Sequence, residues 1–246
     1  MNEKVHLLRS EALQNERAVW VREPRDPASA EHLVVFLDGE FYRDRVGANA
    51  VIDASGLGLA DAWFVFVSLQ SPEARWLECP CHPPFARCIV RELLPWLAER
   101  HPAIRRARRR TLAGLSYTGL AAAFIAREFP GVFQQVISQS GSFWWNDCWL
   151  VQAYQADATR LPTAFHLEVG THEVQHPIRH RPDVLQAVSQ LEGVRRFRDV
   201  LQQLGHTVHY AELDGGHQFE AWQKALPGAL RWALPVERQP EHSRAS

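Results

Sequence analysis

The feature that constrains this chain most is a serine bordered by glycines, the stretch GLSYTG at residues 114–119. A short apolar run, residues 111–113, precedes it and an alanine-rich segment, residues 121–129, follows it. The apolar run predicts a buried strand and the alanine-rich segment predicts a helix. Glycines beside the serine allow a tight turn in which strand and helix almost touch. The sequence therefore predicts a strand–turn–helix unit with a serine hydroxyl standing at its turn.

A serine in such a turn is typical of the nucleophile elbow of α/β-hydrolases. The usual elbow has glycine two residues after the serine, where this chain has Thr118 and then Gly119. A β-branched residue restricts the backbone, so we expect Thr118 to keep a negative φ and Gly119 to take up any unusual geometry. Glycine at position 118 should then be tolerated in catalysis. An ordinary Gly/Ser turn is the competing interpretation of this segment taken alone.

Two downstream segments favour the catalytic interpretation. Glu173 follows a predicted strand at residues 163–169, and His217 follows another at residues 207–213, directly after two glycines. The chain order serine, acid, histidine is that of α/β-hydrolases. Catalytic groups also gather just beyond the strand ends of open α/β sheets. We therefore predict Ser116 as the nucleophile, His217 as the general base and Glu173 as the acid that orients the histidine.

The acid is the least constrained member of this set. Glu168 is an alternative, although it lies inside the predicted strand, and Asp214 is another, although it is too close to His217 in sequence to face it easily. A Ser–His dyad without an acid is a third possibility.

The remaining chain alternates strand and helix signals. Further strands are predicted at residues 17–22, 33–37, 63–69 and 135–140, and helices at residues 88–100, 184–204 and 219–233, with Pro95 as an irregularity in the first helix. Such alternation indicates a mostly parallel sheet covered on both faces. We expect a single-domain α/β-hydrolase over residues 1–234 and a frayed polar tail over residues 235–246.

Composition argues against several other classes. The formal net charge is −1, so we expect no nucleic-acid partner, and the basic run at residues 105–110 is best explained as a solvated loop. Residues 1–19 lack the apolar segment of a signal peptide, and no run of about 18 apolar residues predicts a membrane span. The four cysteines fit no disulfide framework, so we expect free thiols in the cytoplasm.

Three stretches together carry a resemblance to a known family. They are LLPW at residues 93–96, the elbow, and VISQSGSFWW at residues 136–145, and they resemble the putative-esterase family, in particular its enterochelin (enterobactin) esterase-like and esterase D-like members. LDG at residues 37–39 is similar to that family's strand end near the oxyanion hole, and GGH at residues 215–217 to its histidine motif. The resemblance covers about residues 30–232. It implies a cofactor-independent esterase.

The resemblance and the elbow geometry also suggest the rest of the site. The backbone N–H of Tyr117, with that of Gly39 or Glu40, is expected to form the oxyanion hole. The resemblance places Trp144 and Trp145 beside the active site, where they would suit an aryl or catechol ester, although aromatic residues are more often core. Four arginines in loops expected near the mouth are candidates for binding an anionic group: Arg43, Arg45, Arg75 and Arg87.

A metal site is a weaker alternative. His172, His176 and His180 are spaced four apart and would share one face of a helix, but two prolines interrupt that segment. Cys79 and Cys81 with His82 lack a second ligand pair. We therefore expect no metal and no cofactor.

The sequence thus predicts a serine esterase that forms an acyl-enzyme on a small-molecule ester, with aryl or catecholate (siderophore-like) esters as candidate substrates. Acyl transfer to an alcohol by the same machinery is an alternative, and so is a non-catalytic binding protein of the same fold. The natural ester and the oligomeric state stay open.

Overall fold

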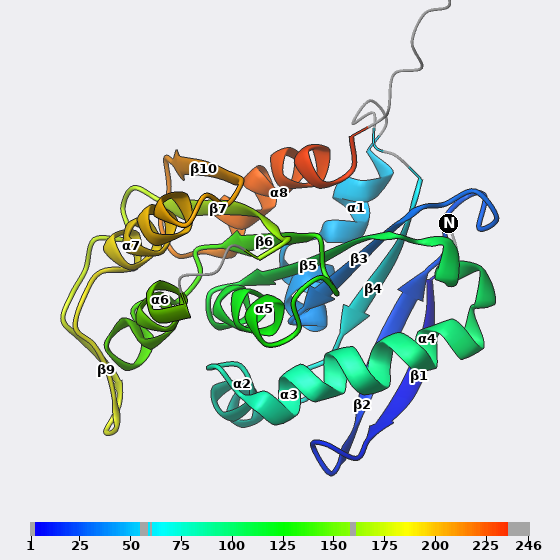
Figure 1. The fold of residues 1–246 in the computed structure, drawn as a ribbon, viewed down its shortest axis with the longest axis horizontal. Helices are drawn as coiled ribbons and strands as arrows, with labels where there is room; N and C mark the ends of the chain where they lie inside the picture. The colour runs from blue at the N-terminus through cyan, green and yellow to red at the C-terminus, as the bar shows by residue number, and fades with distance from the viewer. Residues whose placement is uncertain (1–2, 55–58, 60, 158–160, 236–246) are drawn as a thin grey trace, which may run out of the picture.

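An eight-stranded sheet runs through the centre of the protein (Figure 1). The computed structural model describes residues 3–54, 59, 61–157 and 161–235. The sheet has the order β1-β2-β4-β3-β5-β6-β7-β10, and its neighbours pair in parallel from β4 to β10, whereas β1, β2 and β4 pair antiparallel. The strands are β1 Glu3–Ser10, β2 Asn15–Arg22, β3 His32–Leu37, β4 Ala62–Val67, β5 Arg109–Leu115, β6 Gln135–Gln139, β7 Ala164–Gly170 and β10 Val208–Leu213.

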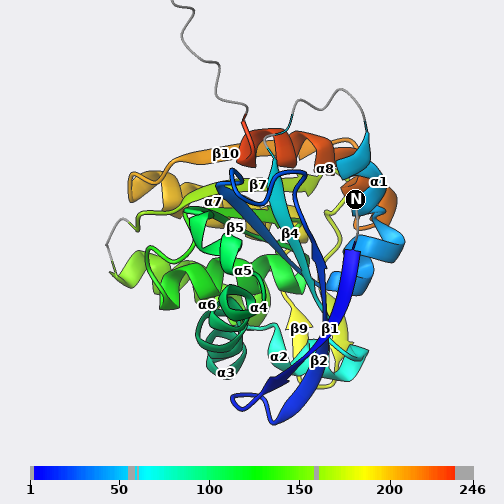
Figure 2. The same ribbon diagram turned by 90° about the vertical axis from the view of Figure 1, so that its right-hand side faces the viewer.

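Helices cover both faces of this sheet (Figures 1 and 2). One face carries the π-helical turn η1 Phe41–Arg45, α1 Ala48–Asp53 and α8 Phe219–Ala233. The other face carries α3 Pro83–Arg87, η2 Cys88–Leu93, α4 Leu94–Arg100, η3 Pro102–Arg106, α5 Tyr117–Glu128, α6 Trp145–Asp157 and α7 Gln190–Gln203. Helix α2 Pro72–Glu78 lies between β4 and α3 along the chain. Apolar side chains from each layer form one core on each face, as the predicted two-sided α/β architecture requires.

The predicted helix at residues 88–100 contains a wide turn where Pro95 enters. The backbone is π-helical over Cys88–Leu93 and α-helical over Leu94–Arg100. Proline has no N–H and its ring clashes with the carbonyl four residues back, so a wider preceding turn removes the conflict. The predicted irregularity at Pro95 is confirmed.

The predicted helix at residues 184–204 is wrong over its first turn and a half. Residues Val184–Gln186 form β9, which pairs antiparallel with β8 Ile178–Arg181 in a separate hairpin. Helix α7 starts after Ser189, whose Oγ accepts from the N–H of Glu192 at 3.1 Å. Val184 and Val188 continue the apolar spacing of the helix backwards, which explains the error. The Ser-x-x-Glu pattern at residues 189–192 is a capping signal that marks the true start.

Strand β1 was not predicted. Its outward side chains, such as Val5 and Leu7, are exposed at the edge of the sheet, and Leu8 is its one buried apolar residue. An edge strand with exposed apolar residues and a mostly polar inward side has little periodicity to detect. Residues 236–246 of the predicted tail lie outside the described residues. Within the described ranges, no helix is both long and apolar enough to cross a membrane.

Candidate active site

The serine turn lies between β5 and α5. Ser116 has φ 54° and ψ −119°, a strained conformation for a non-glycine residue. A Cβ on Gly114 would lie 2.1 Å from the carbonyl oxygen of Thr118, and one on Gly119 would lie 2.6 Å from Ser138 Oγ. Both glycines are therefore required because no side chain fits where the elbow crosses the sheet.

The backbone strain falls on a different residue from the one expected. Thr118 lies in the first turn of α5, outside the positive-φ residues, as predicted. Gly119 is also helical, so the expectation that it takes up the unusual geometry is wrong: Ser116 itself does. Gly119 is needed for space rather than for backbone freedom.

Two hydrogen bonds link Ser116, His217 and Glu173 in that order. The three residues follow the carboxyl ends of β5, β10 and β7, respectively. The Oγ of Ser116 is 3.0 Å from Nε2 of His217, and Nδ1 of His217 is 2.6 Å from Oε2 of Glu173. A carboxylate only accepts, so the Nδ1–H of His217 donates a hydrogen bond to Glu173, and Nε2, which carries no proton, accepts from the serine. Three side chains separated by up to 101 positions thus meet in the arrangement expected of a nucleophile, a base and an orienting acid.

The Glu173 carboxylate is fixed on both oxygens. Its Oε1 accepts from Ser140 Oγ at 2.6 Å and from the Gly170 N–H at 2.8 Å, while Oε2 faces His217. Ser140 in turn accepts from Trp222 Nε1 at 3.1 Å. Glu173 is 6 % exposed, so this network holds its carboxylate in one orientation out of water.

The two alternative acids have other partners. Glu168 is buried behind the site, where it contacts Nε2 of His166 at 3.0 Å and accepts from Gln139. The Asp214 side chain is 94 % exposed and lies 3.2 Å from Nε2 of His172.

Thr118, which stands where the usual elbow has glycine, forms hydrogen bonds that hold the elbow in place. Its Oγ1 donates to Oδ2 of Asp38 at 2.8 Å and accepts from the Leu115 N–H at 2.9 Å. Asp38 directly follows β3 and holds the guanidinium of Arg75 by two nitrogens at 2.8–2.9 Å. Burial alone would lower the pKa of Arg75, but the charge of Asp38 and its hydrogen bonds to the guanidinium together raise that pKa, so Arg75 stays a cation. The elbow is thereby tied to a buried ion pair beside Ser116.

A cleft of about 450 Å³ opens above Ser116. Arg75, Glu173 and His217 contribute its polar side, together with Ser142, whose Oγ lies 3.4 Å from that of Ser116. Aromatic side chains from distant parts of the chain contribute the other side: Trp76, Tyr117, Trp144 and His180. Trp76 and His180 were not predicted as site residues with this role, because a contact between α2 and a hairpin a hundred residues later has no local sequence signal.

The other predicted binding residues differ in their placement. Trp144 lines the cleft, whereas Trp145 packs against the core and does not line it. Arg43 pairs with Glu3 at 2.7 Å and lies over Trp20, and Arg87 is exposed at the end of α3. Neither arginine lines the cleft, because the predicted loops are the helical elements η1, which carries Arg43, and α3, which carries Arg87.

The remaining candidates are placed as follows. Arg45 lies over the ring of Phe219, 4.4 Å from its centroid, and Gly39 fits against the backbone of Val67. The Glu40 side chain accepts a hydrogen bond from Ser68 Oγ, so the candidate oxyanion-hole donor at this residue is its backbone N–H. The oxyanion-hole role of Tyr117, Gly39 and Glu40 remains a prediction.

The three evenly spaced histidines do not share a helix. His172 and His176 lie in the turn after β7, and His180 lies in β8. Among the described residues, no group of three or more His, Cys, Asp or Glu side chains is arranged to hold a metal ion. All four cysteines, Cys79, Cys81, Cys88 and Cys148, are free.

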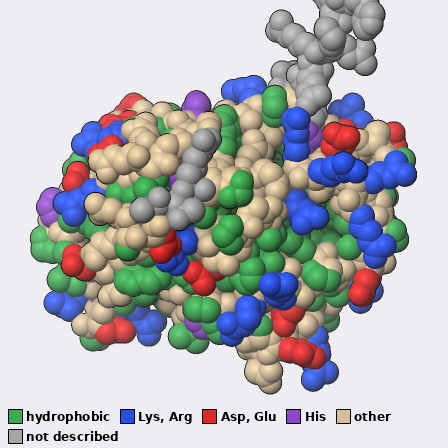
Figure 3. All heavy atoms as spheres, in the orientation of Figure 1, with side chains coloured by type: hydrophobic (Ala, Val, Ile, Leu, Met, Phe, Trp, Pro, Cys, Tyr) green, Lys and Arg blue, Asp and Glu red, His purple; other side chains and the backbone are tan. Residues whose placement is uncertain are grey.

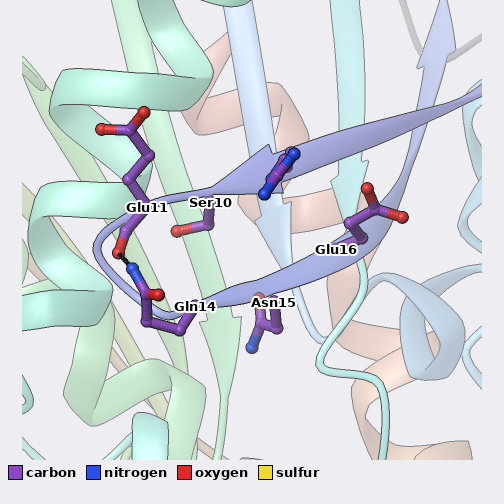
Figure 4. A pocket seen from close by; sticks show the side chains of 6 residues that line it. Ser10, Glu11, Gln14, Asn15 and Glu16 are labelled. Atoms are coloured by element: carbon purple, nitrogen blue, oxygen red, sulfur yellow. Dashed lines mark hydrogen bonds between the residues drawn. The ribbon is translucent and has the colours of Figure 1, made fainter.

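A second and larger hollow, about 670 Å³, lies at the tip of the β1–β2 hairpin (Figure 4). Its labelled residues come from the hairpin alone, and Gln14 donates back to the carbonyl of Glu11. It holds no nucleophile–base pair, so the cleft at Ser116 is the better candidate despite its smaller volume.

The face of the molecule drawn in Figure 3 mixes basic and acidic side chains, with Lys and Arg most frequent on the right-hand side of that view.

Comparison with known proteins agrees with this fold. The Shigella flexneri enterobactin esterase, crystallised in the presence of enterobactin, superposes with a TM-score of 0.81 at 27 % identity, covering 95 % of this chain and 59 % of that one. Iron(III) enterobactin esterases from Dickeya dadantii (strain 3937) and Escherichia coli O6:H1 are 28 % and 29 % identical over 232 residues. These alignments cover 92 % and 90 % of this chain but 53 % and 54 % of the relatives, so the chain spans about half their length.

The fold is that of the α/β-hydrolases, with a mostly parallel sheet between two helical layers. Residues 10–233 match the family described as "Putative esterase". The chain belongs to that family.

Proposed function

We propose that this protein is a serine esterase that cleaves carboxylic esters through an acyl-enzyme. The observation that carries the proposal is the pair of contacts Ser116–His217 and His217–Glu173, at 3.0 and 2.6 Å, at the base of a cleft. A serine hydroxyl is a weak nucleophile by itself and needs an adjacent base held in the correct tautomer. This arrangement supplies both requirements, with the acid buried and immobilised.

In the first step, Ser116 Oγ attacks the ester carbonyl while His217 Nε2 takes its proton. The resulting imidazolium is stabilised by Glu173 and returns the proton to the departing alcohol. Water then enters, His217 accepts one of its protons, and the hydroxide attacks the acyl-enzyme. His217 finally protonates Ser116 Oγ as the carboxylic acid leaves.

The oxyanion of each tetrahedral intermediate requires donors fixed in advance. In this proposal the backbone N–H groups of Tyr117 and of Gly39 or Glu40 supply them. Tyr117 begins α5, so its N–H belongs to the unsatisfied set at a helix start. The Arg75 guanidinium, fixed by Asp38 next to the elbow, lines the same cleft and offers a hydrogen-bond donor group to a bound ester.

An ester with an aromatic group is the substrate class that this site suits best. Four aromatic side chains line the cleft, and the relatives from Dickeya dadantii and Escherichia coli O6:H1 described above are iron(III) enterobactin esterases. A catecholate ester is therefore the first candidate to test. Those relatives are about twice as long, so the whole-protein substrate is carried over only as part of this proposal.

A cytoplasmic location belongs to the same proposal. Its support is that the cysteines are free, three of them buried, which suits a reducing compartment. Burial raises the pKa of the Cys79 thiol well above its usual range, so this thiol stays protonated and unreactive.

The test is a panel of esters with acetyl, aryl, feruloyl and catecholate-serine groups, assayed with the wild type and with Ser116→Ala. We expect hydrolysis by the wild type, a preference for aromatic members and no turnover by the variant. An alcohol acceptor in the assay separates transferase from hydrolase activity, because a transferase would form a new ester. Failure of every ester, with a folded protein, would favour a non-catalytic binding protein.

A further inference from the structure

The β8–β9 hairpin projects away from α7 and forms an arm of the molecule (yellow, Figure 1). Most of its residues are exposed, and its two strands pair only with each other. One of its side chains, His180, nevertheless lines the cleft above Ser116. The hairpin therefore contributes to the site from outside the sheet that carries the reacting groups.

His180 completes a closed set of four ring contacts, which we call the aromatic wall: Trp76, Tyr117, Trp144 and His180. His180 stacks on Trp144 with centroids 5.0 Å apart and ring planes 12° apart, and it lies 5.9 Å from Trp76. Trp76 meets Tyr117 edge-on at 4.8 Å, and Tyr117 lies 5.7 Å from Trp144. Tyr117 directly follows Ser116, so the wall begins at the nucleophile.

Polar contacts behind the wall hold two of its members in place. Trp144 Nε1 donates to Gln190 Oε1 at 2.5 Å, and Gln190 Nε2 donates to the carbonyl of Ser140, the residue whose hydroxyl holds Glu173. His180 Nε2 contacts Gln186 Oε1 at 2.8 Å across the hairpin. The Trp144 ring is thus linked through Gln190 to Ser140, which also holds the acid, and His180 is fixed to the buried Gln186.

We propose that His180 is a specificity-determining residue, through which the β8–β9 hairpin completes an aromatic wall that favours esters bearing a flat ring. Aromatic rings gain from stacked or edge-on contacts beyond the area they bury, whereas a saturated ring of similar size does not. His180 is exposed and lines the cleft, so a substrate ring in the cleft can contact it. This inference rests on the proposed esterase function. It adds that the site selects esters by their aromatic ring.

The test uses two matched pairs of esters that differ only in ring saturation. Methyl benzoate and methyl cyclohexanecarboxylate place the ring on the acyl side, and phenyl acetate and cyclohexyl acetate place it on the alcohol side. The quantity measured is the ratio of kcat/KM within each pair, for wild type, His180→Ala and His180→Phe. Intrinsic reactivity cancels when variant and wild type are compared.

In one of the two pairs, His180→Ala should lower the aryl-to-saturated ratio about two- to tenfold, the value of a lost ring contact. The loss should appear in KM for the aryl ester, with kcat and the saturated ester nearly unchanged. His180→Phe keeps a ring and should keep the preference. Leu185→Ala is the matched control, since Leu185 is an exposed apolar residue of the same hairpin that does not line the cleft.

Unchanged ratios in His180→Ala would overturn the proposal, and so would an equal loss in His180→Phe or in Leu185→Ala. If the wild type hydrolyses none of these four esters, the esterase function is decided by the wider ester panel, and the wall can still be tested. Calorimetric binding of phenyl and cyclohexyl acetate to Ser116→Ala, with and without His180→Ala, then gives the ring preference directly. Equal preference in both proteins would again overturn it.

Discussion

The strand-end residues and the β8–β9 hairpin contribute to one cleft in opposite ways. Ser116 and Glu173 are 9 % and 6 % exposed and are held by hydrogen bonds of 3.0 Å or less to the sheet loops around them. The hairpin is mostly exposed, with Leu185 44 % exposed, and reaches the cleft through ring contacts. The nucleophile and the acid are therefore fixed by the core, whereas ring selection is assigned to an exposed arm outside the central sheet.

This division has a physical basis. Catalysis tolerates little displacement of a nucleophile or base, so those groups are best placed on rigid elements with supporting hydrogen bonds. Binding loops can change more freely because few buried contacts depend on them. Each of the following experiments changes one of the two regions and asks whether the other responds.

The largest effect is expected at the strand ends. Ser116→Ala or His217→Ala should each lower kcat on the order of a millionfold, because the pair acts as one unit. Kinetics of the single and double variants on one ester check this, with circular dichroism to confirm the fold. Residual activity within tenfold of wild type, or clearly additive losses in the double variant, would contradict the claim that the two residues act as one catalytic unit.

A smaller loss is expected at the acid. Glu173→Gln should cost about a hundredfold less in kcat than Ser116→Ala, because the acid orients and stabilises the histidine without reacting. Asp214→Asn is the control, since its side chain is exposed next to the histidine loop. A silent Glu173→Gln would indicate a Ser–His dyad, and a damaging Glu168→Gln or Asp214→Asn would move the acid role elsewhere.

The elbow threonine should matter for stability more than expected from the sequence. Thr118→Val removes the hydroxyl that bonds buried Asp38 and the Leu115 N–H, at a cost of about 1–3 kcal/mol of unfolding free energy. Thr118→Ser keeps the hydroxyl and should stay close to wild type. Urea denaturation of the two variants gives the comparison. Equal stability of valine and serine would show that the Thr118–Asp38 bond contributes nothing.

No effect is expected from metal removal. Ser116 and His217 supply nucleophile and base without a Lewis acid, so dialysis against a strong chelator should leave ester hydrolysis unchanged. The assay after dialysis, with and without added zinc, checks this. Activity that is lost and then restored by zinc would give His172, His176 and His180 a metal-binding role and make the hairpin part of the catalytic machinery.

The same two regions differ in how well sequence reveals them. The elbow glycines, the strand-end acid and the glycine-bordered histidine each carry a local pattern, and the chain order of the three makes their meeting predictable. The parallel sheet follows from alternating strand and helix signals in the same way. These parts of the fold could be predicted because short segments dictate them.

The hairpin has no comparable signal. Val184 extends the apolar spacing of α7, so a strand is mistaken for a helical turn, and only the capping pattern at Ser189 marks the boundary. The Trp76–His180 contact joins elements far apart in the chain, and the Thr118–Asp38–Arg75 set joins three. Side-chain contacts of this kind depend on tertiary packing and cannot be deduced from single segments.

The most direct test of the central claim is labelling with a fluorophosphonate, which reacts with a serine activated by a neighbouring base. Intact-mass and peptide analysis of the wild type should show one adduct, on Ser116, and Ser116→Ala should show none. His217→Ala should slow the labelling at least a hundredfold, whereas His180→Ala should leave its rate nearly unchanged. An adduct on another residue, or equally fast labelling of His217→Ala, would contradict the assignment of Ser116 as a nucleophile activated by His217.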